Sequence, residues 1–304
     1  MTPNFCVLLS YYNGGNYIEE QIRSIFNQIN VNVHLIIRSD GSNIDNVNLL
    51  YKLKSKYKFD LIIEDNIGVY SSFMRLISLV NNKFNYYSLA DQDDVWLPLK
   101  LYSAYMSIRD YHHIPALYSS NVAYVNENLD ILSISDINYS HYNFKNLLVE
   151  NYVIGCTAVF NNLACGIINS RIPQNALMHD WWIALIVKAT GKIIFDNNYY
   201  ILYRQHANNV IGQINRSPFY YYNLMKNFLY NFNCSKLRTS DQADILKDYY
   251  SHTIDNVFLN DINLFVSAKH SFFKRLHIFF SRSFSRNNFF DNIFYKFQIL
   301  INKY

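Results

Sequence analysis

Short apolar runs alternate with segments of helical periodicity over the first hundred residues. The runs that predict strands are Phe5–Ser10, Val33–Ile37, Leu61–Glu64 and Tyr86–Ala90. Between them, Tyr17–Gln28 and Val69–Val80 carry apolar residues at helical spacing, with Asn16 as a candidate N-cap. Strand–helix alternation with short connections is typical of parallel strands. The pattern therefore predicts the α/β class, with a Rossmann-like, mostly parallel open sheet and flanking helices.

The pattern changes along the second half of the chain. Further strand-like runs are Ala116–Ser120, Val122–Val125, Ile193–Phe195 and Tyr200–Tyr203, with a helix over Trp181–Ala189. From about residue 217 no strand is evident, and helices are expected over residues 217–233, 241–259, 261–281 and 287–302. We therefore expect two parts, a catalytic α/β domain over 1–212 and an all-helical appendage over 213–304.

Polar segments directly follow each of the first four predicted strands. They are Ser10–Asn13, Asp40–Ser42, Asp65-Asn66 and Asp91–Asp94. Ligands of open α/β sheets bind in the crevice beyond the carboxyl ends of the strands. The four loops are therefore expected to share one rim, and that rim is the candidate site.

Three aspartates stand within four residues, at positions 91, 93 and 94. Carboxylates this close repel one another unless a cation or hydrogen-bond donors intervene. Mg²⁺ and Mn²⁺ prefer oxygen ligands and are commonly held by one or two carboxylates together with substrate phosphates. Taken alone, the cluster also fits a solvated acidic turn.

The order of the motifs resembles a known family. The segments concerned are 10–28, 39–42, 66–68 (Asn-Ile-Gly) and 90–98 (Ala-Asp-Gln-Asp-Asp-Val-Trp-Leu-Pro). Over residues 5–212 the chain is similar to family 2 glycosyltransferases with the GT-A fold, especially the bacterial rhamnosyltransferase-like branch. The last 92 residues lie outside this resemblance.

The resemblance implies a set of nucleotide-binding residues. Ser10 and Tyr12 would line the base pocket, with Tyr12 stacking on the base, and Asp40 would accept a hydrogen bond from the imide N–H of a uracil or thymine. The family often has two aspartates where this chain reads Ser39-Asp40. Asp91 would bind the ribose. Asn66 is a further candidate, and the alternative for these loops is a turn that carries helix-capping groups.

A cation site is implied by the same resemblance. Asp93 would coordinate the metal that bridges the diphosphate, while Asp94 would either support it or belong to a capping turn. The segment Tyr203–Gly212 resembles the end of the family's catalytic domain, and within it His206 would complete the metal shell and Arg204 would meet the diphosphate. A histidine after a strand can also be purely structural.

Asp180, in Met178-His179-Asp180-Trp181-Trp182, is the candidate general base. A helix N-terminus keeps a carboxylate ionised, so the spacing alone fits a helix cap equally well. The resemblance favours the base, and one catalytic carboxylate implies inversion at the anomeric carbon. Trp181 would stack on a sugar or fill the core. The turn Gly155–Thr157 resembles a family segment near the acceptor.

Composition and charge add a cellular context. Half of the 304 residues are hydrophobic and 16% are charged, which suits a folded chain. The net charge is −2 over residues 1–212 and +6 over 213–304. The four cysteines form no C-x-x-C pair, and no run reaches the ~20 apolar residues of a membrane span. A cytoplasmic protein is expected, peripheral on the inner face of a bacterial cell membrane.

The basic tail supports that expectation. Residues 265–304 contain seven Lys/Arg, one Asp and twelve Phe/Tyr. Helices of this composition can lie on an anionic membrane surface. The alternative is an appendage packed against the catalytic domain or a second subunit, and no motif indicates nucleic-acid binding.

The sequence thus predicts a metal-dependent, inverting glycosyltransferase. The donor would be dTDP-L-rhamnose or a UDP-hexose, and the acceptor a lipid-linked glycan of O-antigen or capsule synthesis. A non-catalytic nucleotide-sugar-binding homologue that acts as an assembly partner is the alternative. A dehydrogenase is disfavoured because the first turn lacks G-x-G-x-x-G, and a P-loop enzyme because no G-K-[ST] occurs.

Overall fold

Parallel strands form one half of the central sheet. The computed structural model describes residues 2–80, 83–137, 142–206, 216–230 and 237–304. The first four strands are β1 (Asn4–Tyr11), β2 (Asn32–Asp40), β3 (Asp60–Glu64) and β4 (Tyr86–Ala90). They pair in the order β3-β2-β1-β4, all parallel, so their carboxyl ends lie at one edge. This confirms the predicted α/β class.

The other half of the sheet is mixed. It contains β5 (Val95–Trp96), β6 (Ala116–Val125), β7 (Ile131–Ile134), β8 (Val159–Asn161) and β9 (Lys192–Arg204). The short strand β8 runs antiparallel to β4 and β6, while β6 and β9 are parallel. Strands β6 and β9 each continue through two predicted runs, because bulges near Asn121 absorb the polar residues between those runs.

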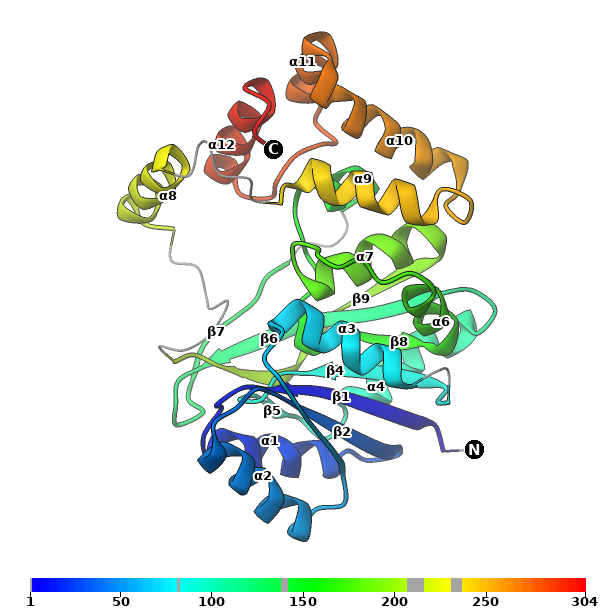
Figure 1. The fold of residues 1–304 in the computed structure, drawn as a ribbon, viewed down its shortest axis with the longest axis vertical. Helices are drawn as coiled ribbons and strands as arrows, with labels where there is room; N and C mark the ends of the chain where they lie inside the picture. Colours follow the sequence, from blue (N-terminus) through cyan, green and yellow to red (C-terminus); the bar gives the residue numbers. More distant parts are fainter. Residues whose placement is uncertain (1, 81–82, 138–141, 207–215, 231–236) are drawn as a thin grey trace.

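Helices cover both faces of the sheet (Figure 1). The helices of the sheet region are α1 (Tyr17–Phe26), α2 (Ile44–Lys56), α3 (Val69–Val80), α4 (Lys100–Ile108), α5 (Phe144–Val149), α6 (Asn162–Ser170) and α7 (His179–Thr190). Residues of α1, α2 and α4 belong to one buried cluster, and residues of α3, α5, α6 and α7 belong to the other. The two clusters pack on opposite faces of β1, because its side chains alternate between them.

The described residues of the C-terminal region form helices joined by short loops and contain no strand, as predicted. Its helices are α8 (Pro218–Tyr230), α9 (Thr239–Tyr250), α10 (Asn256–Ser267), α11 (Phe272–Phe280) and α12 (Phe289–Leu300). The prediction of one helix over 241–259 is wrong, because the Asp255 side chain accepts a hydrogen bond from the N–H of Val257 and starts a new helix there. None of the described helices combines the length and the apolar character needed to cross a bilayer.

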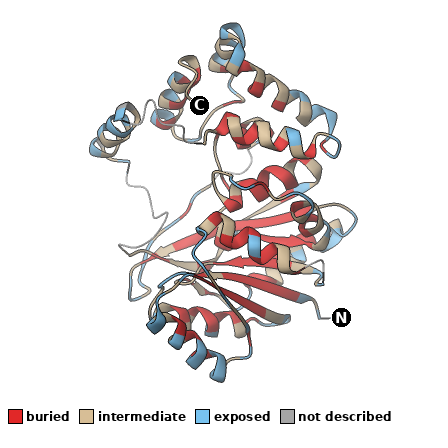
Figure 2. Cartoon of the chain, viewed as in Figure 1, coloured by how far each residue is buried: buried red, intermediate tan, exposed pale blue. Residues whose placement is uncertain are grey.

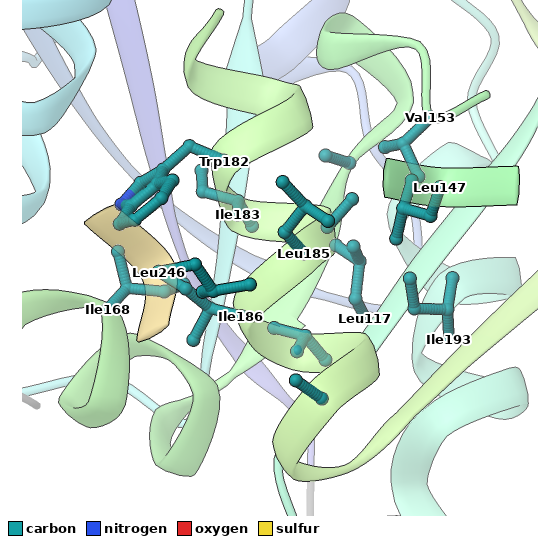
Figure 3. Packing of buried hydrophobic residues seen from close by; sticks show 14 of the residues in the cluster. Leu117, Leu147, Val153, Ile168, Trp182, Ile183, Leu185, Ile186, Ile193 and Leu246 are labelled. Atoms are coloured by element: carbon teal, nitrogen blue, oxygen red, sulfur yellow. The ribbon is translucent and has the colours of Figure 1, made fainter. Parts of the chain in front are cut away.

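The hydrophobic core continues from the sheet into the C-terminal helices. Figure 3 shows Leu246 of α9 beside Trp182 and Ile186 of α7, and all three belong to the cluster that contains Leu117 of β6. Tyr304 near the chain's end is buried in the same cluster. The predicted division at residues 212/213 lies in 207–215, outside the described residues.

Candidate active site

Three neighbouring strands deliver the candidate residues to one edge of the sheet. Ser10 of β1 is in register with Arg38 of β2, and Leu9 is in register with Ala90 of β4. The loops that begin at Tyr12 and Asp91, and the end of β2 at Asp40, therefore meet at the same rim, as predicted. Helix α3 contributes Ser72 to this edge, because the Ser72 Oγ lies 2.6 Å from the Ser10 Oγ.

Asp40 is buried and accepts three hydrogen bonds from the protein. Its carboxylate accepts hydrogen bonds from the N–H groups of Ile67 (2.8 Å) and Gly68 (3.1 Å) and from the Arg38 guanidinium. Asn66 donates through Nδ2 to the Asp40 carbonyl (2.9 Å). The carboxylate thus shapes the loop after β3 in this structure, and a contact with a base would use its remaining lone pairs.

Arg38 is a site residue that the sequence analysis missed. It is buried, and its guanidinium also donates to Glu64 (2.9 Å), the Asp65 carbonyl (2.9 Å) and Ser72 Oγ (2.9 Å). Buried charges must be paired and hydrogen-bonded to be tolerated, and Arg38 meets both conditions. Its signal was an arginine directly after the apolar run Val33–Ile37, two residues before Asp40.

Tyr12 presents its ring to solvent at the rim. The side chain of Gln92 accepts a hydrogen bond from the Tyr12 N–H (2.8 Å) and donates to its carbonyl (3.3 Å). Tyr12 is 52% exposed. The first and fourth loops are therefore joined through the middle residue of the acidic motif, and the exposed ring is free to stack on a planar ligand.

Asp93 and His206 come together from opposite ends of the sheet region. His206 Nε2 lies 2.7 Å from Asp93 Oδ2 although 113 positions separate the two residues. The His206 ring also stacks on Tyr17 of α1, with centroids 5.4 Å apart. This pairing of a carboxylate with an imidazole supplies two ligand types that divalent cations accept.

The surroundings of Asp91 raise the pKa of its carboxyl group. Burial, and then the negative charges of Asp93 and Asp180, raise its pKa to about 7. Asp91 and Asp180, which the sequence analysis assigns to ribose binding and to catalysis, therefore interact electrostatically. One oxygen of Asp91, one of Asp94 and the Cys156 sulfur also lie within 4.8 Å of one another, a grouping that can hold a metal ion.

Asp94 lies beneath this group and is almost completely buried. Neither of its side-chain oxygens has a hydrogen-bond partner, and burial together with the charges of Asp91 and Asp93 raises its pKa. Cys156 and the backbone of Arg204 favour its ionised form, but neither meets the geometry of a hydrogen bond. Asp94 thus faces inward as part of the support of the site.

Lys100 is the positive charge behind the acidic motif, and it too was missed. It is buried, donates through Nζ to Ser88 Oγ (2.7 Å) and lies over the Trp96 ring at 3.4 Å. Burial lowers its pKa to about 7, while the charges of Cys156, Asp94 and Asp91 oppose that shift. A Lys at the start of a helix six residues after the motif was the available signal.

Arg204 is held by several neighbouring groups. It is buried, donates through Nε to the Asp93 carbonyl (3.0 Å), bonds Glu20 (2.6 Å) and the Glu127 carbonyl, and lies over the Tyr17 ring at 4.4 Å. In this arrangement it fixes the main chain of Asp93. Arg204 also lines a cavity of about 430 Å³, together with residues of α1 and with Lys56, Tyr57 and Glu127.

Asp180 sits in the first turn of α7, beside the turn Gly155–Thr157. Met178 is the N-cap and contributes no side-chain cap, whereas Asp180 accepts a hydrogen bond from the N–H of Trp181 (2.7 Å). Burial raises its pKa to about 6, opposed by the N–H of Trp181 and the amide of Asn151. A methyl group at Gly155 would stand 3.3 Å from Asp180 Oδ2 and 3.0 Å from the His179 ring, so the bare backbone there makes room for both.

The two tryptophans after Asp180 have different environments. Trp182 is completely buried in the core. Trp181 is half-buried and donates through its indole N–H to the Leu147 carbonyl (2.6 Å), which turns the polar side of the ring toward α5. His179 is buried against Phe73, with ring centroids 4.0 Å apart, and burial lowers its pKa to about 3. It is therefore a neutral neighbour of Asp180.

The sheet with its acidic edge loop defines the class of protein, a glycosyltransferase with the GT-A fold. Residues 6–165 match the model of the family described as "Glycosyl transferase family 2", which is more than half of the chain. The chain therefore belongs to family 2, in agreement with the resemblance seen in the sequence.

Individual relatives agree with this assignment. The chain is 28% identical over 220 residues to the dTDP-rhamnosyl transferase RfbG of Shigella flexneri, covering 67% of this chain and 73% of that protein. Its fold is similar to that of S. aureus TarS 1-349 in complex with UDP-GlcNAc (TM-score 0.57, 14% identity, 99% of this chain and 89% of TarS 1-349). It is also similar to that of the mannosyltransferase PcManGT from Pyrobaculum calidifontis in complex with GDP-Man and Mn²⁺ (TM-score 0.50, 12% identity, 100% and 86%).

Proposed function

We propose that the protein transfers one sugar from a nucleoside-diphosphate sugar to a hydroxyl group, with a divalent cation and with inversion at the anomeric carbon. The observation that carries the proposal is the convergence of Asp91, Asp93, His206 and Asp180. His206 lies 2.7 Å from Asp93, and the charge of Asp180 raises the pKa of Asp91. The pair proposed to bind the cation and the proposed base therefore both lie near Asp91.

The donor is proposed from the relatives and from the rim. RfbG is named a dTDP-rhamnosyl transferase, and the titles of the TarS and PcManGT structures name UDP-GlcNAc and GDP-Man. dTDP-L-rhamnose or a UDP-hexose is the proposed donor. Ser10, Tyr12 and Asp40 would hold the base, with Asn66 fixing the Asp40 main chain, and Asp91 would hold the ribose.

The residues at the rim fit Mg²⁺ or Mn²⁺. Closely spaced carboxylates with a raised pKa, together with a neighbouring imidazole, gain stability from a divalent cation. Asp93 and His206 would hold it, and Arg204 would keep the Asp93 main chain in place. A bound divalent cation supplies Lewis-acid stabilisation of the negative charge on a departing diphosphate.

Asp180 is proposed as the general base. Because burial raises its pKa to about 6, it is largely ionised at neutral pH yet basic enough to accept the proton of an acceptor hydroxyl. Attack assisted by one carboxylate from the face opposite the leaving group inverts the anomeric carbon. Trp181 would border the acceptor, with its ring orientation fixed by the Leu147 carbonyl.

A lipid-linked glycan of bacterial surface polysaccharide synthesis, such as O-antigen or capsule, is the proposed acceptor. The similarity to RfbG supports this choice. Such an acceptor is presented at the inner face of the cell membrane, and the basic, aromatic residues 265–304 would bring the enzyme to that anionic surface.

Thermal stability in the presence of single nucleotide sugars tests the donor and the cation together. We expect one of dTDP-L-rhamnose, UDP-glucose and UDP-GlcNAc, with Mn²⁺ or Mg²⁺, to raise the melting temperature, because a ligand that binds only the native state stabilises it. EDTA should remove the effect, and the anomeric configuration of the product should be opposite to that of the donor. No response to any metal–nucleotide pair would contradict the proposal.

A further inference from the structure

Helix α12 exposes one apolar face along its length. Phe289, Phe290, Ile293 and Phe297 are exposed, whereas Tyr295 on the other side is buried. At 3.6 residues per turn, the four exposed residues span only about 100° of the helix circumference. Soluble proteins rarely expose a continuous apolar strip of this kind unless something covers it.

Helix α8 adds a second exposed face beside α12. It contacts α12 through Tyr221, whose ring lies 5.5 Å from that of Phe290, and through Phe228, whose ring lies 5.4 Å from that of Phe294. On the opposite side of α8, Phe219 and Tyr230 point away from this contact and are exposed. Tyr222 and Lys226 lie on the same side, also exposed.

Helix α11 flanks the other side of the α12 face. Lys296 of α12 donates to the carbonyls of Ile278 and Ser281 at the end of α11 (both 2.7 Å). Around α12, the exposed arc lies between Lys296 and Phe294, that is, between the contacts with α11 and α8. Phe273 of α11 is 82% exposed.

Helices α8 and α11 both contact α12, so these exposed aromatic faces belong to neighbouring helices, and together we call them the aromatic rim. Figure 2 shows exposed residues along the outer sides of these helices, and in Figure 1 α8 lies on the same side as the carboxyl ends of β1 and β2. The rim includes α8, so it extends beyond residues 265–304. Phe280, the last residue of α11, is also exposed and belongs to the rim.

Cations accompany the aromatic rim. Lys226 of α8, Lys274 of α11 and Arg282 after α11 are exposed. In the described part of the chain none of the three has a carboxylate within 4.0 Å, whereas Lys269 bonds Asp241 and Asp244. The outward charge at the rim is therefore positive and uncompensated.

We propose that the aromatic rim of α8, α11 and α12 docks on an anionic lipid bilayer and lies in the plane of its interface. Aromatic rings favour the boundary between headgroups and acyl chains, and flanking Lys and Arg are attracted by anionic headgroups. A second copy of this chain would bring the same positive charges together, so it fits the rim less well. The docking rests on the proposed function in one respect, because the bilayer is where a lipid-linked acceptor would be met.

Flotation of the full-length protein with lipid vesicles tests the rim. We expect binding to vesicles of equal phosphatidylcholine and phosphatidylglycerol but not to phosphatidylcholine alone. The variant F273S/F280S/F289S should bind about tenfold more weakly or worse, because three rings no longer enter the interface. The variant K226Q/K274Q/R282Q should lose a similar factor, and salt should weaken the wild type more than this variant.

The matched control is I44S/I131S/L132S, which removes three exposed apolar side chains from α2 and β7. It should bind vesicles like the wild type. Undiminished binding by both rim variants would overturn the proposal, and so would a rim variant that becomes monomeric in light scattering while its vesicle binding is unchanged, since the rim would then join two copies.

Sugar transfer to a water-soluble acceptor, measured in parallel, separates the two proposals. Both rim variants should retain it, since none of their residues lies at the acidic edge. Vesicle binding without any transfer would refute the proposed function and leave the docking intact, whereas transfer without vesicle binding would refute only the docking.

Discussion

At the scale of single residues, the carboxylates of the site are accompanied by two buried basic side chains. Arg38 pairs with Asp40 at the end of β2 and with Glu64 at the end of β3, and Lys100 stands behind the acidic motif. Burial and neighbouring negative charges still raise the pKa of Asp91 to about 7, and they raise that of Asp94 as well. A site in this state is prepared for a cation, because binding one relieves the repulsion.

Replacing Asp180 with Asn should abolish transfer and leave donor binding unchanged. The amide can keep the contact with the N–H of Trp181 but cannot accept a proton, so we expect the turnover number to fall about 10²–10⁴-fold. The donor dissociation constant, measured by calorimetry, should stay within a factor of about two, a change too small to matter. Near-normal turnover would refute the assignment of the base.

The pH dependence of the wild-type enzyme provides an independent check on the same residue. A base must be deprotonated to act, and burial raises the pKa of Asp180 to about 6. The rate should therefore be low below pH 6 and rise as pH increases through that value. A rate that falls over this range, measured as kcat/KM with saturating cation, would contradict the assignment.

Asp93 and His206 should determine cation affinity. D93N and H206A each remove one proposed ligand, and both should weaken Mn²⁺ binding in the presence of nucleotide by about tenfold or more. Titration by calorimetry measures the effect. D110N, which changes an 83% exposed carboxylate away from the site, is the control and should bind Mn²⁺ normally. Equal affinity in all three variants would exclude the proposed ligands.

At the scale of elements, the turn Gly155–Thr157 connects the two sides of the site. Cys156 approaches Asp91 and Asp94, while Gly155 packs against Asp180 and His179. The carboxylate base is thus positioned by a short turn before β8, as well as by its own helix.

The variant G155A should displace Asp180. The added methyl group would stand 3.0 Å from His179 Nε2, closer than most real contacts, so α7 or the turn must shift by a few tenths of an ångström. We expect kcat to fall by about tenfold because catalytic groups tolerate little misplacement. The donor KM should change little. A variant with normal kcat and weakened donor binding would show that the turn serves the donor side.

At the scale of the whole molecule, the catalytic sheet and the C-terminal helices share one hydrophobic core. Leu246, Phe265 and Tyr304 are buried in the same cluster as Leu8 of the central strand β1. The helices beyond residue 213 therefore shield a face of α7, the helix that carries Asp180. Their inner sides stabilise the enzyme, and their outer sides are left to form the aromatic rim.

A cavity at Leu246 should destabilise the whole chain. L246A removes a fully buried side chain between α9 and α7, and we expect a loss of about 2–5 kcal/mol in the free energy of unfolding. Denaturant unfolding followed by tryptophan fluorescence and by activity should give one coincident transition. L132A, at a 56% exposed position, should be close to neutral. Two separate transitions would mean that the two regions fold independently.

Local patterns in the sequence were sufficient for the parallel half of the fold. The predicted bounds Val69–Val80 and Tyr86–Ala90 agree with α3 and β4, because periodicity reports which face of a helix or strand is buried. Placement of the polar loops at one edge followed from parallel pairing. The motifs that indicated the family follow the ends of strands, so their order along the chain reflects the order of the strands.

Only the tertiary structure decided which groups meet. His206 reaches Asp93, Lys100 lies behind Asp94 and the turn at Gly155 touches Asp180, and no local pattern encodes contacts between such distant positions. Arg204 has the composition of a phosphate ligand, yet its buried partners give it a supporting role in this structure. The sequence determines which chemical group stands at each position. Where each side chain points, and which groups it meets, depends on packing that involves the whole chain.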